Sequence, residues 1–272
     1  MTSDKLMLRG LLTVAILLIA LTPLAAEPPA EEFFPYSAES NISVDHSPWA
    51  GILDKYLDAD HPSGVNRFDY DAVSSTDRQV LADYLESLES VDVAVLNRDE
   101  QMAFWINFYN ALTVEVILDH YPVDSIRDIS LPGSRGGPWK AALVTVKGTD
   151  LSLDDIEHGI LRPIWKDPRI HYAVNCASIG CPNLADMPYE SDRLEEMLDD
   201  AAREYVNHSR GVGFEGRRVT LSSIYNWYDE DFGDRNGLVD HLLKYADSDT
   251  AAELRGYDGR FRYDYDWELN QP

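Results

Sequence analysis

The chain has 272 residues and a formal net charge of -25, because 48 acidic residues outnumber 23 lysines and arginines. So negative a protein is a poor partner for nucleic acid or for an anionic membrane surface. Hydrophobic residues make up 44% of the chain, enough for one sizeable core. With only two cysteines, a framework of many disulfides is excluded.

The N-terminus has the order of a secretory signal. Lys5 and Arg9 precede an apolar run over 11–21, and small residues lead to Ala26. The run is shorter than a membrane-spanning helix needs. We therefore expect a signal peptide over 1–26, cleaved near Ala26, and a periplasmic or secreted protein with no stable membrane insertion after cleavage. A retained N-terminal anchor is the alternative.

The remaining chain is expected to form one domain over 48–272, preceded by a flexible arm over 27–47 that is rich in Pro, Glu and Ser. Apolar residues at helical spacing predict helices over 49–57 and 76–88. The next helix, over 98–120, is apolar nearly all round, which predicts a central and buried position.

Two asparagines interrupt this apolar helix. Asn107 and Asn110 are three residues apart, so their amides project from one face. A buried amide without partners costs about 1–3 kcal/mol. Each should therefore hold a loop, a helix end or a site residue, either as a structural clamp or as part of an active site.

The second half of the chain predicts shorter elements. A strand is expected over 142–146, and Ser152 with Asp155 forms a capping box for a helix that ends near Leu161. Alternation over 169–175 predicts another strand. Further elements are expected at 191–205, 218–221 and 238–245. The fold class is thus α+β, with a small, mostly antiparallel sheet packed against the long buried helix and several shorter helices. A papain-like arrangement is one form of it.

Three motifs follow one another along the chain: AFWINFYNAL (103–112), LSLDDIEHGILR (151–162) and RIHYAVNCASIGCP (169–182). Together they resemble the family labelled domain of unknown function, number 547. The resemblance extends through PVDSIRDI and SSIYNWYDEDF and covers roughly residues 65–246. It implies no activity, but it marks positions: Trp105, Asn107, Asn110, Glu157, His158, Arg162, His171, Cys176 and Ser178. Cys181 belongs to only part of the family's pattern, which favours a role for Cys176 alone.

A cysteine attacks as a thiolate, and an ordinary thiol is only a few per cent ionised at pH 7. A neighbouring imidazole would correct this. His171 is five positions before Cys176, so on a regular strand it points to the opposite face. His158 is not on this strand, and its predicted helix can pack against the end of the strand beside Cys176. We expect His158 to be the base.

Asn107 or Asn110 would then orient the imidazole or donate to an oxyanion, as amides do in papain-like enzymes, and Glu157 completes the expected catalytic set. The other marked residues are expected to bind substrate: Trp105, Arg162, His171 and Ser178. Such a site would perform acyl transfer in the cell envelope, by hydrolysis or transpeptidation of an amide or ester. The substrate would be a small molecule or peptide-like, with no cofactor and no metal.

Other interpretations remain open. A non-catalytic envelope module for binding or scaffolding would have Cys176 and Cys181 in a disulfide, with Glu157, His158 and Arg162 as a satisfied polar cluster. Thiol redox chemistry is another, although the cysteine spacing differs from the usual two-residue motif. Zinc would use the two cysteines with His158 and His171, which lack paired-ligand spacing. The glycines over 133–137 do not form a phosphate-binding loop.

Overall fold

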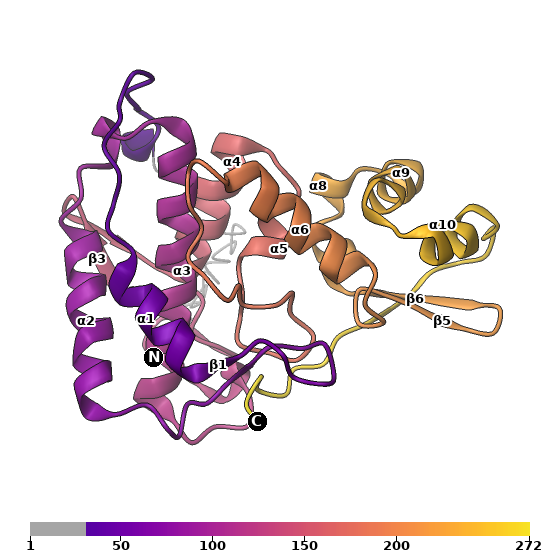
Figure 1. Ribbon diagram of the computed structural model, residues 1–272, viewed down its shortest axis with the longest axis horizontal. Helices are drawn as coiled ribbons and strands as arrows, with labels where there is room; N and C mark the ends of the chain where they lie inside the picture. Colours follow the sequence, from indigo (N-terminus) through magenta and orange to yellow (C-terminus); the bar gives the residue numbers. More distant parts are fainter. Residues whose placement is uncertain (1–30) are drawn as a thin grey trace, which may run out of the picture.

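The computed structural model describes residues 31–272, so the predicted signal peptide over 1–26 and its cleavage site near Ala26 lie outside the described residues. Figure 1 shows the first half of the chain gathered around a long helix, α3, while the last part forms a second group of helices with a three-stranded sheet. The helices of the first group are α1 (Ser47–Tyr56), α2 (Ser75–Glu89) and α3 (Arg98–His120), with short 3-10 helices η1 (Glu31–Phe33), η2 (Val93–Val95) and η3 (Ile126–Asp128).

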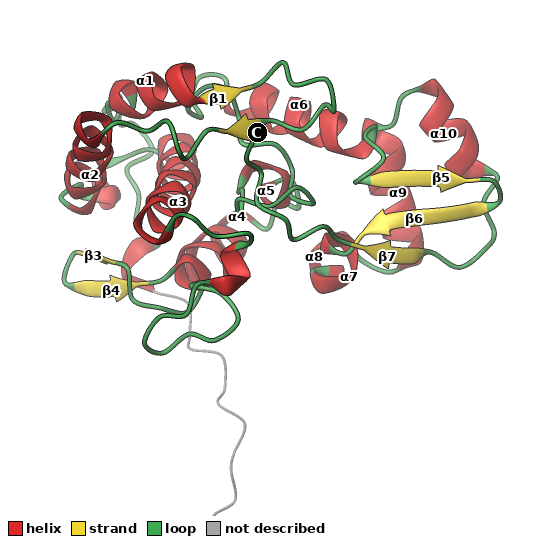
Figure 2. Ribbon diagram, turned by 90° about the horizontal axis from the view of Figure 1, so that it is seen from below, coloured by secondary structure: helices red, strands yellow, loops and turns green. Residues whose placement is uncertain are grey.

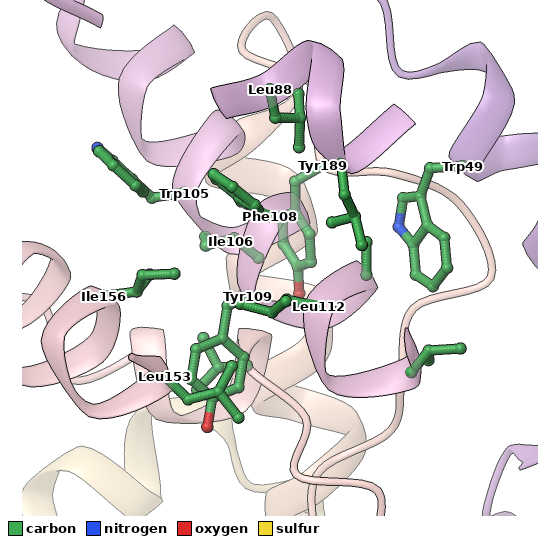
Figure 3. Close-up of a cluster of buried hydrophobic side chains, with 14 of the residues drawn as sticks. Trp49, Leu88, Trp105, Ile106, Phe108, Tyr109, Leu112, Leu153, Ile156 and Tyr189 are labelled. Carbon is green, nitrogen blue, oxygen red and sulfur yellow. The ribbon is translucent and has the colours of Figure 1, made fainter. Parts of the chain in front are cut away.

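Helix α3 is the centre of the larger core and has the predicted extent. Asn97 caps its start by accepting the Glu100 N–H at 2.9 Å. Nearly every side chain from there to Leu118 is buried. Figure 3 shows Trp105 and Phe108 among the side chains that this helix contributes to the core, and their rings stack with centroids 6.1 Å apart. Because every residue of α3 from Glu100 to Val114 is buried, a polar side chain in this stretch needs a partner inside the protein.

A hairpin and a series of short helices follow: β3 (Val144–Val146), β4 (Thr149–Leu151), η4 (Asp155–Leu161), α4 (Arg162–Trp165) and α5 (Ile170–Ala173). The predicted capping box is present, because Ser152 and Asp155 exchange side-chain to backbone hydrogen bonds. Helix η4 is a π-helix, a rare form that is frequent at functional sites.

The segment over 169–175 is a helical turn and not the predicted strand. The Val174 N–H donates to the Ile170 carbonyl at 3.1 Å, which closes the turn of α5. Ile170 packs in the larger core and Tyr172 in a smaller second core. His171, which a half-exposed strand would turn to water, is 3% exposed. The alternating apolar residues that predicted a strand belong to a helical turn whose two sides pack against different cores.

The last part of the chain contains α6 (Leu194–Val206), β5 (Val212–Glu215), β6 (Arg218–Ser222), α7 (Ile224–Trp227), α8 (Asp229–Phe232), α9 (Arg235–Tyr245), α10 (Ser248–Arg255) and β7 (Arg262–Asp264). Helix α6 joins the two cores, since Leu198 packs in the larger one and Tyr205 in the smaller one. Within residues 31–272, no helix combines the length and the apolar character that a bilayer crossing requires.

The mixed α and β class is confirmed. The strands of the described chain form three small sheets (Figure 2): β1 (Leu57–Asp58) with β2 (Arg67–Phe68), β3 with β4, and β5–β6–β7. Pairing is antiparallel except between β6 and β7, where Leu221 lies opposite Tyr263 in a parallel register. The long helix α3 packs chiefly against α2 and η4.

Residues 31–47, expected as part of a flexible arm, pack against the domain. Phe33 is fully buried and meets the ring of Trp105 edge-on, with centroids 5.3 Å apart. The Val44 N–H donates to the Glu100 carboxylate at 2.7 Å. Over its described part, the arm therefore contributes to the larger core.

The first prediction tests this arm. Phe33→Ala should lower the free energy of unfolding by about 3–5 kcal/mol, because it removes a fully buried ring and leaves a cavity. Ile42→Ala, in the same arm at a side chain 53% exposed, should change it by less than about 0.5 kcal/mol. Urea unfolding of the two variants checks this; equal, small effects would mean that the arm is not part of the folded unit.

Candidate functional site

A pocket of about 280 Å³ lies between η4, α5, α7 and the last residues of the chain. Its wall contains Cys176 and Cys181 from the turn after α5, Glu157 and His158 from η4, and His171 from α5. Residues that the sequence marked in separate motifs therefore meet in one cavity.

The segment that carries Cys176 is attached to the long helix by one amide. Asn110 donates from Nδ2 to the Ala173 carbonyl at 2.9 Å, and its Oδ1 accepts the Asn175 N–H at 2.8 Å. All of these groups are buried. Asn110 is thus a backbone clamp that places the cysteine, and it donates to neither an imidazole nor a pocket group.

The turn after Cys176 is held in an unusual conformation. Ala177 has a φ of 61°, in the left-handed region that costs a non-glycine residue roughly 1 kcal/mol or more. Asn175 supports it by accepting the Ala177 N–H at 2.7 Å and donating to the Pro182 carbonyl at 2.7 Å. Gly180 then lets the C-terminal segment approach, because an added Cβ would lie 2.7 Å from the backbone nitrogen of Asp266.

Cys176 is half-buried, and its sulfur is surrounded by hydrogen-bonding groups. The sulfur lies 3.0 Å from the Cys181 sulfur, 3.2 Å from Ser178 Oγ and 3.2 Å from the Tyr265 hydroxyl. Hydrogen bonding from Cys181 and from the two hydroxyls lowers the pKa of the Cys176 thiol despite the opposing effect of burial. Burial raises the pKa of the Tyr265 phenol well above its usual value, so Tyr265 stays neutral and can donate to a thiolate.

Cys181, the second cysteine of the pair, is buried and has a raised pKa. Both cysteines are free thiols. Cys181 is buried, and its sulfur accepts the Cys176 N–H at 3.0 Å. Burial, followed by the neighbouring Cys176, raises the pKa of Cys181 well above the ordinary value. Of the two sulfurs, Cys176 is therefore the one that ionises, with Cys181 as its proton-bearing neighbour.

His171 is the centre of a buried ionic cluster. Its Nε2 lies 2.6 Å from Asp231 Oδ2 and its Nδ1 lies 3.4 Å from Glu157 Oε1, while its ring stacks on Tyr228 with centroids 4.0 Å apart. Arg162 donates to the same Asp231 oxygen at 2.6 Å. Burial disfavours the imidazolium, but the two carboxylates outweigh it and raise the pKa of His171. Histidine and arginine serve here as partners of the buried Glu157 and the half-buried Asp231 carboxylates.

His158 lies on the pocket wall but makes no hydrogen bond to Cys176 in the described structure. Its Nδ1 is 3.2 Å from Arg162 Nη1, and its Nε2 is 3.9 Å from Asp154 Oδ1. The expected contact between base and sulfur is therefore replaced by contacts along η4 and α4, and the sulfur takes its hydrogen bonds from a thiol and two hydroxyls.

Two other expected site residues lie away from the pocket. Asn107 donates to the Tyr189 carbonyl at 2.9 Å and accepts the Tyr189 N–H at 2.8 Å, so both its nitrogen and its oxygen bind the backbone of a loop. Trp105, expected to bind substrate, is fully buried against Phe33 and its helix neighbours. Both side chains are buried in the core, whereas Tyr109 of the same helix lines the pocket.

Sequence reasoning missed much of the pocket wall. Trp227 is 45% exposed and joins Tyr265 and Trp267 in an aromatic cluster, with Trp227 to Tyr265 centroids 4.8 Å apart. Trp227 and Asp231 belong to the SSIYNWYDEDF motif, which could have indicated them. Nothing in the C-terminal sequence signalled that Tyr265 reaches Cys176. Within residues 31–272, no group of three or more His, Cys, Asp or Glu side chains is arranged to hold a metal ion.

Residues 93–206 match the model of a family described as "Protein of unknown function, DUF547". The match contains the Asn110 clamp, Glu157, His171 and the two cysteines, and it confirms the resemblance of the three motifs. Tyr265, which lines the pocket, and Asp231, which contacts His171, lie beyond it. The chain matches neither a curated protein nor a solved structure.

The second prediction concerns pH and His171. Because the pKa of His171 is raised in the folded protein, its stabilising effect is complete below the unfolded value of about 6.5 and is lost as pH rises through the folded value. The difference in unfolding free energy between wild type and His171→Gln should shrink from pH 6 to pH 9. Urea titrations across this range measure it, with His61→Gln, at a half-buried histidine outside this cluster, as control. A difference that does not change with pH would contradict the ionic cluster.

The third prediction concerns Tyr265. Tyr265→Phe should raise the pKa of Cys176, because a hydrogen bond to a charged group contributes about 1.5–3 kcal/mol. The thiolate fraction at pH 7 should then fall about tenfold, since 1.4 kcal/mol is about a factor of ten. The pH profile of alkylation by iodoacetamide reports this pKa. Tyr263→Phe, at an exposed ring in β7, should leave the profile unchanged; identical profiles for both variants would remove Tyr265 from the site.

Proposed function

We propose that this chain, which carries a DUF547 region over residues 93–206, is an exported thiol enzyme. In this proposal Cys176 transfers an acyl group from an amide or ester in the cell envelope. One observation carries the proposal. Cys176 is a half-buried residue that lines a pocket, and its sulfur is held by a thiol and two hydroxyls that favour its thiolate. Perturbed nucleophiles in clefts are candidate functional groups.

The chemistry follows from these groups. The Cys176 thiolate attacks the substrate carbonyl, the bond to the leaving amine or alcohol breaks, and a thioester forms on the sulfur. Water or a second amine then attacks the thioester and regenerates the thiolate. Neither step requires a cofactor, but each requires a proton transfer at the leaving or entering group.

His158 is the proposed hydrogen-bond donor to the substrate in this pocket. Arg162 has only N–H groups to offer, so its contact with His158 Nδ1 assigns the proton of the neutral ring to Nε2. The Nε2–H group can therefore donate a hydrogen bond to the oxyanion that forms at the attacked carbonyl, while water exchanges the protons of the leaving and entering groups. In this proposal His158 acts on the substrate, while Cys181, Ser178 and Tyr265 stabilise the sulfur.

A second candidate function is a non-catalytic envelope module in which Cys176 and Cys181 are joined in a disulfide. The 3.0 Å separation of the two sulfurs favours it, because a disulfide of about 2.05 Å requires only a small approach. Such oxidation would consume the nucleophile and leave the aromatic pocket as a binding surface.

The fourth prediction separates the two functions. Reduced protein incubated with p-nitrophenyl acetate should acquire the mass of one acetyl group and release p-nitrophenol. Cys176→Ala should show neither, because the nucleophile is missing. Cys181→Ser should retain both, because a serine hydroxyl can replace the thiol as a hydrogen-bond donor to Cys176.

Intact mass of the protein as purified, before and after reduction, provides the comparison. Hydrolysis that survives in Cys176→Ala, or a Cys176 that reacts with iodoacetamide no faster than N-acetylcysteine at pH 7, would overturn the enzyme proposal. A protein that is fully disulfide-linked until reduced would favour the binding module.

A further inference from the structure

Two cationic side chains line the pocket without being held in an ion pair. Arg135 and Lys140 both line the cavity and are exposed. Neither side chain forms an ion pair or a hydrogen bond with any residue from 31 to 272. In a chain with a net charge of -25, a cavity lined by two cations and by only two carboxylates, Asp154 and Glu157, is much less negative than the protein as a whole.

The carboxylates of the pocket form no ion pair with these cations. Glu157 is buried and lies 3.4 Å from Nδ1 of His171, which compensates its charge. Burial raises the pKa of the Asp154 carboxyl, and the charge of Lys140 is among the groups that lower it. Both cationic side chains can therefore contact a ligand, Lys140 in competition with Asp154.

The same loop supplies an aromatic wall beside the two cations. Trp139 lies between them in sequence and packs edge-on to Trp267, with centroids 5.7 Å apart. Gly137 has a φ of 133°, and an added Cβ would lie 1.7 Å from the Trp139 ring, so only glycine lets the loop fold over this side chain. Trp227, at 5.5 Å from Trp267, extends the wall. An aromatic surface of this kind packs against a ring or another apolar body.

We propose that the acyl group taken up by Cys176 carries a carboxylate, which Arg135 and Lys140 bind while the body of the substrate packs on Trp139 and Trp267. Arginine and lysine are the side chains that bind carboxylates through charge-assisted hydrogen bonds. In this proposal the reacting carbonyl lies at the Cys176 sulfur and the carboxylate at the loop over 134–140, both of which line the same cavity. This substrate class rests on the proposed role of Cys176 as nucleophile.

The fifth prediction compares an anionic and a neutral reagent at the same sulfur. The ratio of the alkylation rate of Cys176 with iodoacetate to that with iodoacetamide should be about tenfold higher in the wild type than in Arg135→Gln/Lys140→Gln, because Coulomb attraction by two nearby charges is lost. The double variant Arg217→Gln/Arg255→Gln removes two exposed cations outside this pocket and should keep the wild-type ratio. The difference should shrink in 1 M NaCl.

The outcomes distinguish the two proposals. Slow reaction of Cys176 with both reagents would refute the nucleophile, and the substrate class with it. If Cys176 reacts rapidly with iodoacetamide but the ratio of iodoacetate to iodoacetamide rates is the same in both double variants, the role of Cys176 as nucleophile is retained and the anionic substrate is refuted. Tryptophan fluorescence gives an independent readout: benzoate should bind the wild type more tightly than benzamide does, and Arg135→Gln/Lys140→Gln should abolish that preference. Equal binding of the two probes would also refute the inference.

Discussion

The position of the Cys176 sulfur depends on one buried amide. Asn110 lies in the buried stretch of helix α3, so it must find hydrogen-bond partners inside the protein or cost about 1–3 kcal/mol. It finds them on the backbone at Ala173 and Asn175, on either side of the point where α5 ends. The requirement to satisfy a polar group in an apolar core thereby fixes where the cysteine turn begins, and the pocket is built outward from it.

Buried charge fixes the opposite wall. Glu157 from η4, His171 from α5 and Asp231 from α8 form one ionic cluster, which ties three short helices together. None of these helices could be stable alone, because each is only one or two turns long. The cluster gives the two histidines different tasks. His171 is committed to carboxylates, whereas His158 remains at the pocket surface.

The features predicted correctly are those that arise from neighbours in the chain. The long helix over 98–120 and the capping box of Ser152 and Asp155 depend on contacts within about four residues, which a local pattern records. The strand over 169–175 was predicted from alternating residue types, a pattern that does not record the burial of His171 in a helical turn. Its burial in an ion cluster involves Asp231, sixty residues further along, and no local pattern contains that information.

By itself, the sequence determined the mixed fold class, the enclosed helix, the need for each of its asparagines to find a partner, and the motif positions that meet in the pocket. Only the tertiary structure decided what those residues contact. It assigned Asn107 and Asn110 to backbone clamps, separated His158 from the sulfur in hydrogen bonding, and brought Tyr265 to Cys176. Residue type and spacing constrain which hydrogen bonds a side chain can make. Which bonds form depends on how distant segments pack, because a buried polar group takes whichever partner the surrounding core places within reach.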